Sequence, residues 1–138
     1  MNFFTIGYGG RPPTEFLDLL MQNQIRTVAD IRLRPERASM GSYVLAKSPE
    51  KGIQGLLSRA GIAYFWCEAL GNPFLGEDEW QDRYRELIHA EGETRCQKLF
   101  ELEAPMCLMC AEKKTSECHR LHVANFLIEQ GHKLEAHL

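Results

Sequence analysis

Short apolar runs alternate along the chain with longer segments in which apolar side chains recur every three or four residues. The short runs have the length and composition of β-strands and span residues 3–6, 27–31, 63–67, 106–110 and 133–138. The longer segments between them have the periodicity of helices. A repeated strand–helix order is typical of a mainly parallel sheet with helices on both faces. We therefore expect an α/β fold, a three-layer α/β/α sandwich with a sheet of about five strands.

Local signals also predict where some helices begin and end. Ser48 followed by Pro49 predicts the start of the second helix, and Gly61 predicts its end. Gly92 is expected to separate two helical segments ahead of the fourth strand. Ser116 is expected to cap the last helix.

The composition of the 138-residue chain is that of an ordinary globular protein, with 44% apolar and 25% charged residues. The net charge of −3 creates no overall positive field that would favour nucleic acid or an acidic membrane surface. The first residues lack the features of a signal peptide, and no apolar stretch approaches the roughly 20 residues that span a bilayer. We therefore expect one domain, residues 1–138, in the cytoplasm and without a membrane partner.

The chain has five cysteines, an odd number that argues against a disulfide framework. In a reducing compartment such cysteines are free thiols, metal ligands or parts of a redox site. Cys67 and Cys107 are expected to be buried packing residues.

Polar side chains follow four of the predicted strands. Ligands of parallel α/β sheets bind beyond the carboxyl ends of the strands, so these side chains are expected to meet at one edge and form a basic pocket. The predicted site residues are Tyr8, Gly9, Gly10 and Arg11 after the first strand, Asp30, Arg32 and Arg34 at the second, Glu68 and Asn72 after the third, and Cys110, Glu112, Lys113, Cys118, His119 and Arg120 after the fourth.

Two groups of these residues are candidates to hold an anion. Gly9-Gly10-Arg11 would offer backbone N–H groups and a guanidinium, or would simply form a tight turn. Asp30 and Arg32 share one face of their strand, where they would pair with each other or serve a ligand.

The segment from Cys110 to Arg120 is the most informative part of the chain. Cys118 is expected in the first turn of the last helix, where free N–H groups favour a thiolate, and His119 and Arg120 would lower its pKa further. Cys110, at a strand end, is the second candidate thiol, and Glu112 is a candidate acid or base. The alternative is that both cysteines only pack.

Zinc ligation by Cys110, Cys118 and either His119 or His122 is a further possibility that the sequence disfavours. Cys107-x-x-Cys110 resembles half of a zinc site, but on a strand this spacing sends the two side chains to opposite faces. No second Cys-x-x-Cys pair completes a four-ligand site. We therefore expect no metal and no cofactor.

Taken together, the motifs resemble those of the family of domains of unknown function numbered 488 (DUF488). The resemblance runs from Thr5 to the last strand, and it implies a compact α/β fold without a settled activity. The stretch from Arg34 to Ser39 departs from the family's pattern. The motifs that carry the resemblance are Thr5-Ile6-Gly7-Tyr8-Gly9-Gly10-Arg11, Asp30-Ile31-Arg32 with Pro35, Gly61-Ile62-Ala63-Tyr64, Leu70-Gly71-Asn72, Cys110-Ala111-Glu112-Lys113 and Cys118-His119-Arg120.

Three functional hypotheses follow. The leading one is an enzyme for an anionic, phosphate-bearing substrate such as a nucleotide or a nucleic-acid end. Arginines would hold the anion, among them Arg34 and Arg37 in an exposed loop. Glu68 or Glu112 would transfer protons, and a cysteine would be the nucleophile. The alternatives are a non-catalytic module that binds a nucleotide or nucleic acid, and a thiol-based redox or metal sensor.

Overall fold

The computed structural model describes residues 1–138 and confirms the predicted order of elements. Several short 3₁₀ helices lie in the connections. The strands and helices are β1 (Asn2–Gly7), α1 (Pro13–Gln22), β2 (Thr27–Asp30), α2 (Gly52–Arg59), β3 (Ala63–Trp66), α3 (Trp80–Arg95), β4 (Met106–Cys110), α4 (Arg120–Glu129) and β5 (Lys133–His137).

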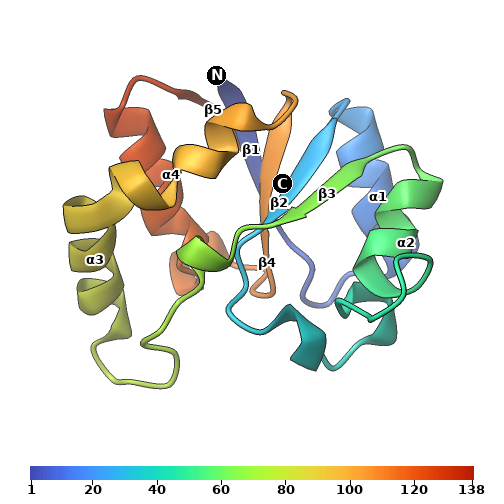
Figure 1. Ribbon diagram of the computed structural model, residues 1–138, viewed down its shortest axis with the longest axis horizontal. Coiled ribbons are helices and arrows are strands. Elements are labelled where there is room, and N and C mark those ends of the chain that lie inside the picture. Colours follow the sequence, from blue (N-terminus) through green and yellow to red (C-terminus); the bar gives the residue numbers. More distant parts are fainter.

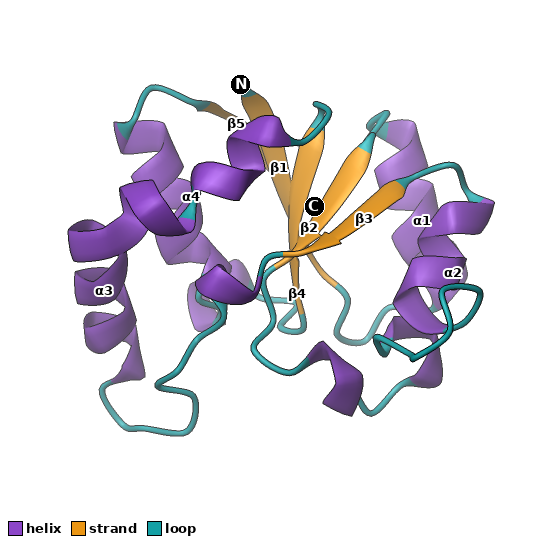
Figure 2. Cartoon of the chain, viewed as in Figure 1, coloured by secondary structure: helices purple, strands orange, loops and turns teal.

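The five strands form one parallel sheet in the order β3-β2-β4-β1-β5. Helices α1 and α2 cover one face of the sheet, and α3 and α4 cover the other (Figure 1). The sheet therefore forms the middle layer between two helical layers, which confirms the predicted sandwich (Figure 2). None of the helices has the length and apolar character needed to cross a bilayer.

The central strand β4 separates two hydrophobic clusters. Met106, Leu108 and Cys110 pack on the side of α3 and α4, whereas Cys107 and Met109 pack on the side of α1 and α2. All five residues are buried because helices cover both faces of the strand. The expected opposite orientation of Cys107 and Cys110 is confirmed, and it directs Cys110 toward α4.

The start of α2 differs from the prediction. Ser48 lies in a turn that closes with a hydrogen bond from the Lys51 N–H to the Ser48 carbonyl (3.1 Å), and the helix begins at Gly52. Gly52 has a φ of 61°, and a Cβ atom there would overlap the Val44 carbonyl oxygen. This tertiary contact with the preceding loop sets the helix start. Gly61 follows α2 with a φ of 73°, as its predicted role requires.

Gly92 does not divide α3, which runs through it to Arg95. A Cβ atom on Gly92 would lie 2.8 Å from the ring of Phe126 on α4. The glycine therefore lets α3 and α4 approach closely, and this packing requirement explains it better than a break in the helix.

The start of α4 also corrects the prediction. Ser116 belongs to a separate 3₁₀ turn, Thr115–Glu117, and α4 begins at Arg120. Cys118 is extended (φ −126°, ψ 142°) and precedes the helix instead of lying in its first turn. Its Sγ accepts the backbone N–H of Arg120 at 3.5 Å, so the sulfur satisfies one of the free N–H groups at the helix start.

Candidate functional site

A cavity of about 550 Å³ lies where β1, β2 and β4 end, at the carboxyl edge of the sheet. This is the edge at which the sequence predicts a pocket. The predicted residues that line the cavity are Tyr8, Arg32, Arg34, Asn72, Cys110, Glu112, Cys118 and His119.

Arg32 is fixed at the cavity wall by a buried network. Its Nε and Nη2 atoms donate to the two carboxylate oxygens of Asp30 at 2.9 and 2.7 Å, and the Tyr64 hydroxyl donates to Asp30 Oδ2 at 2.6 Å. Burial by itself would lower the pKa of Arg32, but the hydrogen bonds and charge of Asp30 raise it, so the guanidinium remains charged. Its Nη1 atom has only the long contact to the Tyr8 hydroxyl, 3.4 Å, and this end of the guanidinium is available to a ligand.

Arg34 and Arg37 are exposed; Arg34 directly precedes the short 3₁₀ helix Pro35–Arg37, and Arg37 is its last residue. Both line the cavity, and neither makes a salt bridge. Asp30 balances the charge of Arg32, whereas Arg34 and Arg37 add two positive charges that form no ion pair in a cavity that Glu112 and Glu117 also line.

Arg120 has a structural environment. Its side chain is fully buried, and Nη1 donates to the Glu112 carbonyl, while Nη2 donates to the Lys113 carbonyl (3.1 Å) and to Thr115 Oγ1 (3.2 Å). Its Nε atom lies 3.3 Å from Thr5 Oγ1. Arg120 therefore holds the loop between β4 and α4 in place, and each of its three guanidinium nitrogens has a partner within the protein.

The glycine-rich segment after β1 forms a tight turn, the alternative that the sequence left open. The Gly9 N–H donates to the Ala111 carbonyl at 2.7 Å, and the Arg11 N–H donates to the Tyr8 carbonyl at 2.9 Å. Gly10 has a φ of 70° and is exposed. The N–H groups of Gly9 and Arg11 therefore have partners within the protein.

Three further predicted residues lie outside the cavity lining. The Arg11 side chain folds back, with Nε donating to the Gly7 carbonyl at 2.9 Å and Nη1 contacting Glu15 at 3.4 Å. Glu68 and Lys113 are exposed. Their positions follow strand ends as predicted, but their side chains do not converge on the cavity, because following a strand does not determine where a side chain points.

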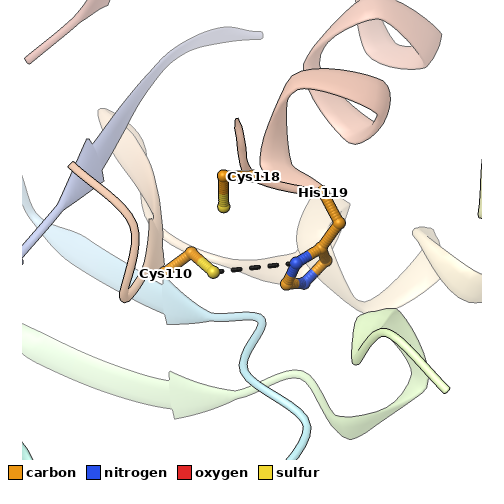
Figure 3. A group of neighbouring side chains, drawn as sticks. All are labelled: Cys110, Cys118 and His119. Carbon is orange, nitrogen blue, oxygen red and sulfur yellow. Dashed lines mark hydrogen bonds between the residues drawn. The ribbon is translucent and has the colours of Figure 1, made fainter. Parts of the chain in front are cut away.

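Cys110, Cys118 and His119 form a compact cluster at the cavity wall (Figure 3). Cys110 Sγ lies 3.7 Å from His119 Nδ1, and the three possible ligand atoms all lie within 4.8 Å of one another. His119 Nε2 is 2.7 Å from the Ile31 carbonyl oxygen. A carbonyl only accepts hydrogen bonds, so Nε2 carries a proton, and Nδ1 is the ring nitrogen that faces Cys110.

The two cluster thiols differ in acidity. The hydrogen bond with Cys118 lowers the pKa of Cys110 in spite of its burial, with help from the backbone N–H groups of Ala111 and Glu112 and from the Arg120 charge. The same hydrogen bond, together with burial, raises the pKa of Cys118. The sequence favoured Cys118 as the thiolate because it was expected inside a helix, whereas the structure favours Cys110.

The remaining cysteines are buried on their own. Burial raises the pKa of Cys67 to about 11 and that of Cys96 to about 12, and it also raises the pKa of Cys107. Such thiols stay protonated at neutral pH, which fits packing residues. No disulfide is formed by any of the five cysteines.

The sequence did not single out several cavity residues, among them Leu33, Leu75, Trp80 and Glu117. Leu75 is 73% exposed, and only the structure shows that it lies at the cavity. Trp80 is the first residue of α3. No motif in the sequence predicts that these residues line the same cavity as Cys110.

The fold and the cavity define an α/β protein whose pocket brings arginines and a thiol–imidazole cluster to the carboxyl edge of a parallel sheet. The family model described as "Domain of unknown function DUF488" matches residues 12–127, and the chain belongs to this family. The resemblance that the motifs indicated is thereby confirmed. Searches of the curated proteins and of the solved structures found no significant match to the chain.

Proposed function

We propose that this protein is an enzyme that acts on an anionic, phosphate-bearing substrate, such as a nucleotide or a nucleic-acid end, with Cys110 as the nucleophile. One observation carries the proposal: a single cavity is lined both by arginines and by the Cys110–His119 pair. Because the chemistry needs free thiols, we further propose that the protein works in a reducing compartment such as the cytoplasm.

The arginines provide the reason for an anionic substrate. The free end of Arg32 is held rigidly by Asp30, and Arg34 and Arg37 add two charges without internal partners. Guanidinium groups bind phosphate oxygens through paired, charge-assisted hydrogen bonds. One arginine held in a fixed orientation and two exposed arginines match a phosphate group better than they match a neutral ligand.

The apolar part of the cavity supports a substrate that is larger than phosphate itself. Leu33, Leu75 and Trp80 line the cavity together with the arginines. An indole ring and aliphatic side chains favour contact with a flat, weakly polar group. A nucleotide combines such a group with a phosphate.

The Cys110–His119 pair provides the reason for an enzyme. In the proposed step the Cys110 proton passes to His119 Nδ1, and the sulfur electron pair forms a bond to the electrophilic atom of the substrate. The bond from that atom to its leaving group breaks with its electrons, and the leaving group takes the proton from His119. Water then cleaves the bond between sulfur and substrate and restores the thiol. The Ile31 carbonyl orients the imidazole throughout.

The proposal is tested by measuring binding and turnover separately. Calorimetric titration with inorganic phosphate, AMP and a 5′-phosphorylated oligonucleotide compares the wild type with R34Q/R37Q and with the control R59Q/R83Q, whose arginines lie outside the cavity. We expect affinity to fall about tenfold or more in R34Q/R37Q only, the loss of one to two charge-assisted hydrogen bonds. Equal affinity in all three proteins would exclude the arginines as the anion site.

Turnover of AMP and of the 5′-phosphorylated oligonucleotide is followed by phosphorus NMR in the wild type and in Cys110→Ser. We expect the variant to bind the phosphate compound with unchanged affinity and to lose turnover. Turnover at the wild-type rate in Cys110→Ser would exclude Cys110 as the nucleophile. Binding without turnover in the wild type would contradict the enzyme and support a binding module.

A further inference from the structure

The thiol–imidazole cluster has the composition and spacing of a metal site. We propose that Cys110, Cys118 and His119 bind one Zn²⁺-type ion through two sulfur atoms and the imidazole Nδ1, and that the fourth coordination position is open to the cavity. The site goes beyond the proposed function and does not rest on it, because it would exist whether or not a phosphate compound binds.

The distances fit a tetrahedral ion. Zinc–sulfur bonds of about 2.3 Å and zinc–nitrogen bonds of about 2.0–2.1 Å place tetrahedral sulfur and nitrogen ligands roughly 3.6 Å apart, and two sulfur ligands roughly 3.8 Å apart. Cys110 Sγ and His119 Nδ1 are 3.7 Å apart, and Cys118 Sγ lies within 4.8 Å of both. Only a small movement of Cys118 is needed to complete the three-ligand set.

The groups around the cluster are those that support ligands. Metal-binding histidines usually donate their second ring N–H to a carbonyl or carboxylate, and His119 Nε2 donates to the Ile31 carbonyl. This bond also fixes the ring so that Nδ1 faces Cys110 Sγ, with Cys118 beside the pair (Figure 3). Cys118 Sγ accepts the Arg120 backbone N–H, which stabilises a thiolate.

The sequence disfavoured zinc because it paired Cys110 with Cys107. Those two side chains lie on opposite faces of β4, as expected. The partner of Cys110 is Cys118 instead, because Arg120 binds the loop carbonyls of Glu112 and Lys113 and folds the loop back over the strand end. His122, the other histidine that was considered, is engaged with Gln81 at 2.9 Å and is not in the cluster.

The cavity gives the proposed ion an open side. All three ligands line the cavity, so a water molecule or a substrate oxygen can take the fourth position, as in catalytic zinc sites. On binding, the two thiols lose their protons to solvent, and the two thiolates balance the 2+ charge of the ion. Cys110 would donate its sulfur electron pair to the ion and could not use that pair to attack a substrate. The pocket can therefore hold the metal ion or present a nucleophilic thiol, but not both at once.

Cobalt(II) is the probe for the test because thiolate ligation gives it intense near-ultraviolet charge-transfer bands and tetrahedral geometry gives it strong visible bands. The reduced full-length chain is stripped with chelator and titrated with Co²⁺, and Zn²⁺ is then added to displace it. We expect one Co²⁺ per chain, with both sets of bands, and full displacement by Zn²⁺. The absence of thiolate charge-transfer bands would overturn the proposal.

Variants assign the ligands. We expect Co²⁺ to bind more than about 100-fold more weakly to each of the variants Cys110→Ala, Cys118→Ala and His119→Gln. This loss exceeds the one expected for a residue that only forms a hydrogen bond to a metal ligand. The matched control Cys67→Ala removes a buried cysteine outside the cluster and should bind like the wild type. Wild-type affinity in Cys118→Ala would overturn the three-ligand site.

A second measurement avoids the risk that a variant misfolds. In the wild type, Zn²⁺ should protect Cys110 and Cys118 together from alkylation, and chelator should reverse the protection. Unchanged alkylation of both thiols in saturating Zn²⁺ would contradict the proposal. Failure here leaves the proposed enzyme intact, because R34Q/R37Q tests the anion site without altering any of the three ligands.

Discussion

Asp30 and Arg32 form a buried, bidentate ion pair at the end of β2, and only one residue separates them in the chain. The pair faces the cavity through Arg32, and its other side is closed by the Tyr64 hydroxyl. An arginine that is fixed in this way presents its remaining N–H groups in one orientation, which favours a ligand of defined geometry.

The first prediction tests this pair. Asp30→Asn leaves the buried guanidinium of Arg32 without a compensating charge, so we expect the free energy of unfolding to fall by about 3 kcal/mol or more. Urea denaturation followed by circular dichroism measures the change. The control Glu15→Gln removes the partly exposed carboxylate that contacts Arg11 and should change stability by less than about 0.5 kcal/mol. Equal effects of the two substitutions would contradict a structural role for the pair.

The second prediction concerns the order in which the cysteines react. The metal-free protein is alkylated at neutral pH after the chelator and the reductant have both been removed. Cys110 should then react faster than any other cysteine, because the hydrogen bond with Cys118 and the nearby N–H groups lower its pKa. Cys67, Cys96 and Cys107 should react only after unfolding, because burial raises their pKa values. Mass spectrometry of digested samples gives the rate at each site. Faster reaction at Cys118 than at Cys110 would contradict the asymmetry.

The third prediction concerns the contact between α3 and α4. Gly92→Ala forces a methyl group against the Phe126 ring, and we expect a loss of about 1–3 kcal/mol in stability. The neighbouring substitution Glu93→Ala, at an exposed position of the same helix, should have an effect within about 0.5 kcal/mol. If close packing is the cause, Phe126→Leu in the Gly92→Ala background should recover part of the loss. A stabilising effect of Gly92→Ala would show that helix propensity outweighs the contact.

The fourth prediction is a dependence of stability on alkaline pH. The pKa values of Cys67 and Cys96 are about 11 and about 12 in the folded chain, above the ordinary thiol value of 9.0. The folded state therefore keeps protons that the unfolded state loses, and this contribution to stability is complete below pH 9 and disappears as the pH rises toward 12. Urea denaturation between pH 7 and pH 11 should show a smaller decline in C67A/C96A than in the wild type. Identical slopes would show that other groups cause the decline.

The periodicity of apolar residues was sufficient to predict the α/β sandwich, because each β-strand and helix imposes its own spacing on the chain. The same rule of alternating faces correctly placed Cys107 and Cys110 on opposite sides of β4. The alternation of strands and helices predicted a parallel sheet, and it therefore predicted a pocket at the carboxyl edge, since parallel strands end at the same side of a sheet. These features depend on local pattern and chain order.

The direction of each polar side chain at that edge depended on the tertiary structure. Arg11 lies just before α1 and Arg120 is the first residue of α4, positions at which an arginine could bind an anion. Arg11 instead folds back onto Gly7, and Arg120 is buried against loop carbonyls. The start of α4 depended on the same loop, which is why Cys118 lies ahead of the helix and beside Cys110. Contacts between residues far apart in the chain, such as that between His119 and Ile31, have no periodic signal. They arise only when the strands and loops pack together, and that packing turns separate cysteine and histidine residues into one site.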